Sequence, residues 1–119
     1  MPEQPETRKL SALIREGAKL HPQGFGAYRT WDKGVLESTC VVGAAMEAAH
    51  LSVSTWGYTP TSRDLNKVLG WKRSSDVPII PYPNGEFSPS RIYSVIIYLN
   101  DMCGWSREAI ADYLASKGL

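Results

Sequence analysis

The sequence predicts a mainly α, α+β fold with about five helices and one small β-hairpin between the first and second helices. Several segments have apolar residues at helical spacing, and one has aromatic and β-branched residues on both sides of a Gly-containing turn. The 119 residues are enough for one hydrophobic core and too few for two domains of usual size. We therefore expect residues 7–119 to form a single compact domain, preceded by a disordered tail at residues 1–6, where Pro2 and Pro5 have only polar neighbours.

The first predicted helix lies within residues 7–21, where one face carries Leu10, Leu13, Ile14 and Gly17. A β-hairpin follows around a three-residue turn at residues 32–34, in which the glycine can adopt a positive φ. This hairpin is the only regular β-structure that the sequence predicts.

The second predicted helix continues to His50 and is capped by Ser38 or Thr39. Its side chains are almost all apolar, and Glu47 carries the one charge. A helix that is apolar on most sides is typical of a core position, so we expect this helix to be central and Gly43 to allow close packing.

The third predicted helix begins at Thr61, with Asp64 three residues later as in a capping box, and ends at Gly70. Residues 70–87 show no periodic pattern and contain three prolines and an Asn84-Gly85 turn signal. We expect a long loop there, and such loops in small domains are often functional.

The fourth predicted helix has Ser88 as its cap and Pro89 as its first residue, and Gly104 ends it. Ser106 then caps a fifth helix that ends at Gly118. The last two helices are expected to form a C-terminal αα-hairpin over the second helix.

Charge and composition exclude several functional classes. The net charge of +1 gives little overall attraction to nucleic acid or to an anionic membrane, so such binding would need a local patch. No secretory signal or membrane-length apolar run is present, which leads us to expect a cytoplasmic protein with no membrane partner.

No cofactor or metal site is predicted, because phosphate-loop, dinucleotide-binding and metalloprotease motifs are absent. The four candidate zinc ligands come from separate segments and lack the clustered spacing of structural zinc sites: His21, Cys40, His50 and Cys103. We also expect both cysteines to be reduced.

Cys40 is the one candidate nucleophile, since a cysteine at a helix N-terminus is placed to favour its thiolate form. His50 is about 15 Å further along an ideal helix, so His21 is the remaining candidate base. The alternative is that Cys40 is a buried, unreactive packing residue, which we favour.

The predicted binding surface combines the hairpin with the long loop. Aromatic and arginine side chains often dominate binding interfaces, and the two segments contain several of them. The candidate binding residues are Arg29, Trp31, Trp71, Lys72, Arg73 and Tyr82. The competing interpretation is that the tryptophans only cover the core.

A local excess of positive charge lies between Arg63 and Arg73. This stretch contains four basic residues and Trp71 against the single carboxylate of Asp64. Basic side chains can bind phosphates and an indole can stack on a base, so nucleic acid is a possible partner at this patch.

Two stretches contain a Gly-Ala-Tyr motif, a Cys-x-x-Gly-Ala helix and an Asn-Asp pair before a Ser-capped helix, at Gly26, Ala27, Tyr28, Cys40, Gly43, Ala44, Asn100, Asp101 and Ser106. In these motifs the chain resembles an uncharacterised family of small actinobacterial and bacteriophage proteins, and the resemblance covers about half of the chain. It implies a phage-related setting and no particular activity.

The sequence as a whole favours a small, non-enzymatic binding or regulatory module of phage or mobile-element type that acts through a protein partner. A homodimer is compatible with this interpretation. The alternatives are a cysteine-dependent hydrolase that uses Cys40 and His21, and a nucleic-acid-binding accessory protein.

Overall fold

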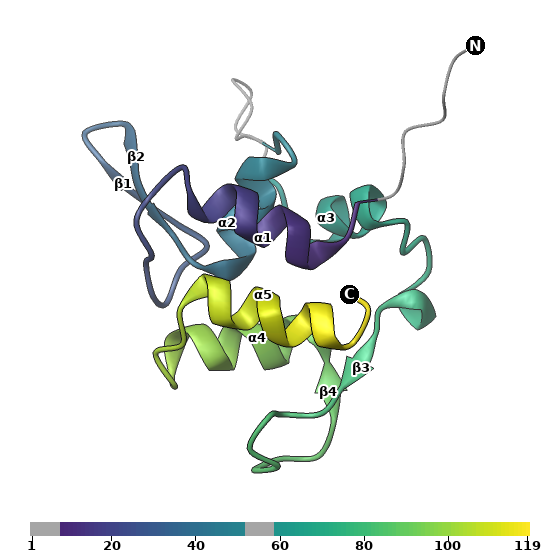
Figure 1. The fold of residues 1–119 in the computed structure, drawn as a ribbon. Coiled ribbons are helices and arrows are strands. Elements are labelled where there is room, and N and C mark those ends of the chain that lie inside the picture. Colours follow the sequence, from purple (N-terminus) through teal and green to yellow (C-terminus); the bar gives the residue numbers. More distant parts are fainter. Residues whose placement is uncertain (1–7, 52–58) are drawn as a thin grey trace.

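Five helices and two short antiparallel hairpins make up the described part of the chain (Figure 1). The structure is a computed structural model that describes residues 8–51 and 59–119, so the predicted tail at residues 1–6 lies outside the described residues. The helices are α1 (Leu10–Ala18), α2 (Val41–Ala48), α3 (Ser62–Leu69), α4 (Ile92–Asp101) and α5 (Arg107–Ser116). The strands are β1 (Arg29–Asp32), β2 (Val35–Thr39), β3 (Ile79–Ile80) and β4 (Ser90–Arg91), and a 3-10 turn, η1, spans Ser74–Asp76. The predicted mainly α, α+β class is confirmed.

Helix α2 lies at the centre of the packing. Helix α1 packs along one side of it and α4 along another, while α5 packs on α1 (Figure 1). Seven of the eight α2 residues are buried, and Val41, Val42 and Met46 have no exposed surface. The central position of this helix is therefore confirmed, although α5 of the C-terminal hairpin lies against α1 rather than over α2. All five helices contribute side chains to one hydrophobic core.

Helices α1 and α2 approach each other closely at Gly17 of α1, to which the sequence assigned a place on the apolar face but no close packing. A Cβ at this position would lie 1.8 Å from the carbonyl oxygen of Ala44 in α2. Gly43, to which close packing was assigned, instead faces the backbone carbonyl of Tyr28, where a Cβ would also meet oxygen at 1.8 Å. Gly17 thus allows α1 to pack on α2, and Gly43 allows the segment before β1 to do so.

The β1–β2 hairpin forms where it was predicted, but its details differ. Its turn has two residues, Lys33 and Gly34, with φ of 51° and 80°, because Asp32 pairs with Val35. Both residues have the positive φ of a type I′ turn, which matches the twist of the strands. Strand β2 continues to Thr39, so Cys40 rather than Ser38 or Thr39 is the N-cap of α2.

Helix α2 also ends earlier than predicted. Its last residue is Ala48, and His50 adopts a left-handed φ of 60°. The backbone N–H of Leu51 donates to the carbonyl of Met46 at 2.9 Å, which closes the helix end. His50 is therefore exposed beyond the helix.

A second hairpin, β3–β4, occupies the segment that was predicted to be a loop. Ile79 pairs with Arg91 and Ile80 with Ser90. The prediction that α4 starts with Ser88 and Pro89 is wrong, since the residues after Pro89 are extended and α4 begins at Ile92. The Ile92 N–H donates to the carbonyl of Pro78 at 2.9 Å, which fixes the start of α4 against β3.

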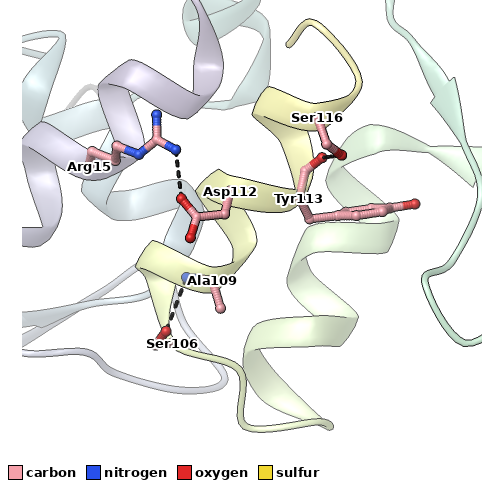
Figure 2. A network of polar contacts seen from close by, with 6 residues as sticks. All are labelled: Arg15, Ser106, Ala109, Asp112, Tyr113 and Ser116. Atoms are coloured by element: carbon pink, nitrogen blue, oxygen red, sulfur yellow. Dashed lines mark hydrogen bonds and ion pairs between the residues drawn. The ribbon is translucent and has the colours of Figure 1, made fainter.

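Polar contacts attach α5 to the rest of the fold (Figure 2). The Ser106 hydroxyl accepts a hydrogen bond from the Ala109 N–H at 3.0 Å, so the predicted cap is confirmed. Arg15 of α1 forms an ion pair of 2.7 Å with Asp112, but both side chains are exposed, and such pairs contribute only about 0–1 kcal/mol. Buried groups hold α5 more firmly than this pair. Ile110 and Leu114 fill its apolar face, and the buried Arg107 guanidinium donates to the Thr39 hydroxyl at 2.9 Å.

Candidate functional site

The two halves of the predicted binding surface lie apart. The β1–β2 hairpin projects at the left of Figure 1, whereas α3 and the segment between α3 and β3 lie at the right. Trp31 in β1 therefore does not share a surface with Trp71, Lys72 and Arg73, which follow α3. The fold corrects the prediction of one combined surface, and the two halves must be considered separately.

Arg29 is engaged inside the fold and is not a surface residue. Its side chain is 6% exposed and forms an ion pair of 2.7 Å with Glu47 of α2. It also donates a hydrogen bond to the backbone carbonyl of Leu51. Arg29 thus fixes β1 and the end of α2 together, and this structural role removes it from the candidate binding residues.

Trp31 and Tyr82 occupy different environments. Trp31 is 52% exposed near the tip of the β1–β2 hairpin. Tyr82 is partly buried, and its ring packs edge-to-face on Phe87 at 5.2 Å and on Tyr98 at 5.4 Å. Tyr82 therefore helps to hold the β3–β4 loop against α4, while Trp31 is exposed on the β1–β2 hairpin.

The start and end signals of α3 fix the position of Trp71. The Thr61 N–H donates to the Asp64 carboxylate at 2.8 Å, which confirms the predicted capping box, and Gly70 ends the helix with φ of 80°. The Trp71 N–H then donates to the carbonyl of Asn66 at 2.8 Å. The chain consequently turns back at Gly70 and sets the indole beside the helix.

Tyr93 of α4 supports the same corner. The Trp71 and Tyr93 rings pack edge-to-face with centroids 6.1 Å apart. The Tyr93 hydroxyl donates to Oδ1 of Asn66 at 2.5 Å, and burial raises the pKa of this phenol. Trp71 is thus held from one side by a neutral, hydrogen-bonded tyrosine and remains partly exposed.

A pocket of about 340 Å³ opens beside Trp71, and we name it the Trp71 pocket. Its walls combine the indole with the basic residues Arg63, Lys67, Lys72 and Arg73, and with Asn66 and Ser74. All four basic residues are exposed. The structure therefore brings the basic stretch of the sequence together around one hollow.

A second pocket of about 340 Å³ adjoins the first and shares Arg63, Asn66 and Ser74 with it. We name it the Arg91 pocket, because Arg91 of β4 adds a fifth basic side chain. Sequence reasoning missed Arg91, since it assigned this residue to the first turn of a helix. The two adjacent isoleucines at residues 79–80, followed by the Asn84-Gly85 turn signal, could have indicated the hairpin that brings it here.

The two pockets together form a positively charged region, which we call the basic surface. Within the described residues, none of its five basic side chains forms an ion pair. The two nearby carboxylates each accept a hydrogen bond from a backbone N–H: Asp64 from Thr61 at 2.8 Å and Asp76 from Arg73 at 2.9 Å. Positive charge therefore dominates at this surface.

Cys40 is buried, as predicted, with 3% of its surface exposed. Its sulfur accepts a hydrogen bond from the Gly43 N–H at 3.5 Å, but burial is the larger influence and raises the pKa of the thiol. No hydrogen bond between Cys40 and His21 occurs in the part of the chain that the structure describes; the His21 carbonyl instead accepts from Arg107 at 2.8 Å. The environment of Cys40 thus disfavours the thiolate that a nucleophile needs.

Chemical labelling tests this conclusion. In a Cys103→Ser background, we expect a thiol reagent to modify Cys40 only after denaturation, because the side chain is inaccessible in the native state. Cys40→Ala should lower the free energy of unfolding by about 1 kcal/mol, since it removes the N-cap acceptor of the Gly43 N–H, whereas the hydroxyl of Cys40→Ser can keep that hydrogen bond. Rapid labelling of the native protein that Cys40→Ser abolishes would instead support the nucleophile interpretation.

The described residues contain neither a metal site nor a membrane-spanning helix. No group of three or more His, Cys, Asp or Glu side chains there could hold a metal ion. None of the helices there combines the length and the apolar character that crossing a bilayer requires. The basic surface, where five basic side chains gather around two adjoining pockets, is the candidate site.

Comparison of the chain with protein-family models, with curated proteins and with solved structures gives no match. The resemblance to the actinobacterial and bacteriophage family accordingly stays a prediction.

Proposed function

We propose that this chain is a non-enzymatic binding module that engages a negatively charged macromolecule through the basic surface. The phage-type, cytoplasmic setting expected from the sequence is part of the same proposal. The observation that carries it is the convergence of five exposed basic side chains, none of them ion-paired among the described residues, on two adjoining pockets.

Fold stability alone gives no reason for this arrangement. Like charges held close together repel one another, and exposed basic residues contribute little to stability when no carboxylate pairs with them. An anionic partner would relieve this repulsion and gain several favourable contacts at once. The burial of Cys40 makes the hydrolase alternative the weaker candidate.

The sequence led us to expect a protein partner, and an acidic protein segment would satisfy the charge of the basic surface. The proposal requires only that the partner is a polyanion, and a heparin column provides a polyanion of known character. We expect the wild-type protein to be retained on heparin at low salt despite its net charge of only +1, because the positive charge is concentrated.

Charge reversal at residues 72 and 73 tests the site. We expect Lys72→Glu combined with Arg73→Glu to abolish retention on heparin, since both residues line the Trp71 pocket. The melting temperature should stay within about 1 °C, because neither exposed side chain forms an ion pair with another described residue.

The matched control is Lys19→Glu combined with Lys33→Glu. It changes the net charge equally at two exposed positions outside the pockets, so retention should be nearly normal. Equal loss of retention in the two double variants would mean that only the net charge matters, and the proposed site would then be wrong.

A further inference from the structure

We propose that the polyanion is a single-stranded nucleic acid, with phosphates in the two pockets and an unpaired base against Trp71. This inference rests on the proposed function and specifies the chemical class of the anionic partner. Three features of the basic surface favour this ligand: paired pockets, guanidinium groups and an accessible indole.

The paired pockets suit a chain of regularly repeated charges. The two hollows have the same volume of about 340 Å³, adjoin each other and share the exposed side chain of Arg63. Volumes in this range are at the lower end of those that enclose small ligands. Each pocket can therefore receive one unit of a polymer, and Arg63 is placed to contact the units in both.

The basic residues of the two pockets include three arginines: Arg63, Arg73 and Arg91. A guanidinium group matches a phosphate with two parallel hydrogen bonds, whereas a lysine acts as a point charge. Hydroxyl groups at Ser74 and Ser94 are exposed at the same walls and can donate to phosphate oxygens. This set of donors fits phosphodiesters closely.

Trp71 offers an aromatic face on which a base can stack, a contact that the carboxylates of an acidic peptide cannot make. Its indole is partly exposed, packs on Tyr93 and lines the pocket between basic side chains. Proteins that bind single strands combine a positive groove with aromatic side chains on which unpaired bases stack. Bases inside a duplex are already stacked and paired, so the indole selects for a single strand over a duplex.

Fluorescence anisotropy of labelled ligands provides the test, with 12-nucleotide oligo(dT) and oligo(U) as probes and a 12-base-pair duplex and a polyglutamate peptide as comparisons. We expect both single strands to bind more tightly than the duplex and the peptide. The oligo(dT) and oligo(U) arms distinguish DNA from RNA as the source of the single strand.

The salt dependence of binding measures how many phosphates the basic surface neutralises. For a single strand, each neutralised phosphate adds about −0.7 to the slope of log K against log salt concentration, so five basic residues give at most about −3.5. Arg91→Ala should make the slope shallower by about 0.7. Lys19→Ala, at an exposed position outside the pockets, should leave it unchanged.

Substitution of the indole tests the stacking contact. We expect Trp71→Leu to weaken oligo(dT) binding by about fivefold or more, and Trp71→Phe to retain most of the affinity, because phenylalanine keeps an aromatic face. The salt slope should not change in either variant, since neither alters the charge. Thermal melts of both variants show whether they fold, and the Arg91→Ala slope tests the inference independently of any loss of folding at residue 71.

Two outcomes would overturn the inference and leave the proposed function standing. One is equal binding of single strand, duplex and polyglutamate; the other is tight binding of polyglutamate alone, which would identify an acidic protein as the partner. Failure of every polyanion, heparin included, would contradict the proposed function as well.

Discussion

A Gly17→Ala variant should lose about 3 kcal/mol of unfolding free energy, or fail to fold, although the same substitution in most helices is stabilising. The new methyl carbon would lie 1.8 Å from the carbonyl oxygen of Ala44 and 2.3 Å from its carbonyl carbon. These are backbone atoms of α2, which is buried between α1 and α4 and cannot move without opening the core. Urea denaturation followed by circular dichroism measures the loss.

The control for this prediction is Glu16→Ala, at the adjacent exposed position of α1. Glu16 forms an exposed ion pair with Arg8, so the change should alter stability by less than about 1 kcal/mol. If Gly17→Ala raised the urea midpoint, as helix propensity alone predicts, the close approach of α1 to α2 would be disproved.

Sequence reasoning succeeded where the determining interactions are local. The capping box of Thr61 and Asp64 and the Ser106 cap each join residues three apart, so their side chains identify the helix starts directly. The apolar character of α2 likewise predicted its central place. In each case, the residues that determine the structure lie within one short segment of the sequence.

The errors in the fold arose where distant segments decide the conformation. Ser88 and Pro89 have the local pattern of a helix start, but Ser90 and Arg91 pair with Ile80 and Ile79 about ten residues earlier. Two-residue strands are too short to show any periodicity. Only the packing of the complete chain selects the hairpin over an earlier helix start.

The candidate site was predicted only in part, for the same reason. Trp71, Lys72 and Arg73 are consecutive and were identified together, whereas Arg91 joins them through the β3–β4 pairing. Arg29 was misassigned because its partner, Glu47, is 18 positions away in the sequence and adjacent only in the fold. The residue types indicated which side chains could bind a partner. The tertiary structure decides which of these side chains are exposed to a partner and which are engaged inside the fold.

Asn100→Ala should lower the free energy of unfolding by about 3 kcal/mol or more, because each buried polar group left without a partner costs about 1–3 kcal/mol. The Asn100 side chain has no exposed surface. Its Oδ1 accepts from the Val41 N–H at 3.2 Å and from Nε2 of Gln23 at 2.9 Å, and its Nδ2 donates to the Gly24 carbonyl at 3.0 Å. The amide therefore connects α4 to the start of α2 and to the loop after α1.

The comparison that isolates these hydrogen bonds is Asn84→Ala, which removes the same amide from an exposed position in the β3–β4 loop and should cost well under 1 kcal/mol. Chemical denaturation of both variants gives the difference directly. The Asn100 amide lies between three segments, so its loss should also weaken protection of the Val41 amide from hydrogen exchange. An Asn100→Ala protein with wild-type stability and unchanged protection at Val41 would mean that other groups satisfy the N-terminus of α2, and that the amide does not hold these three segments together.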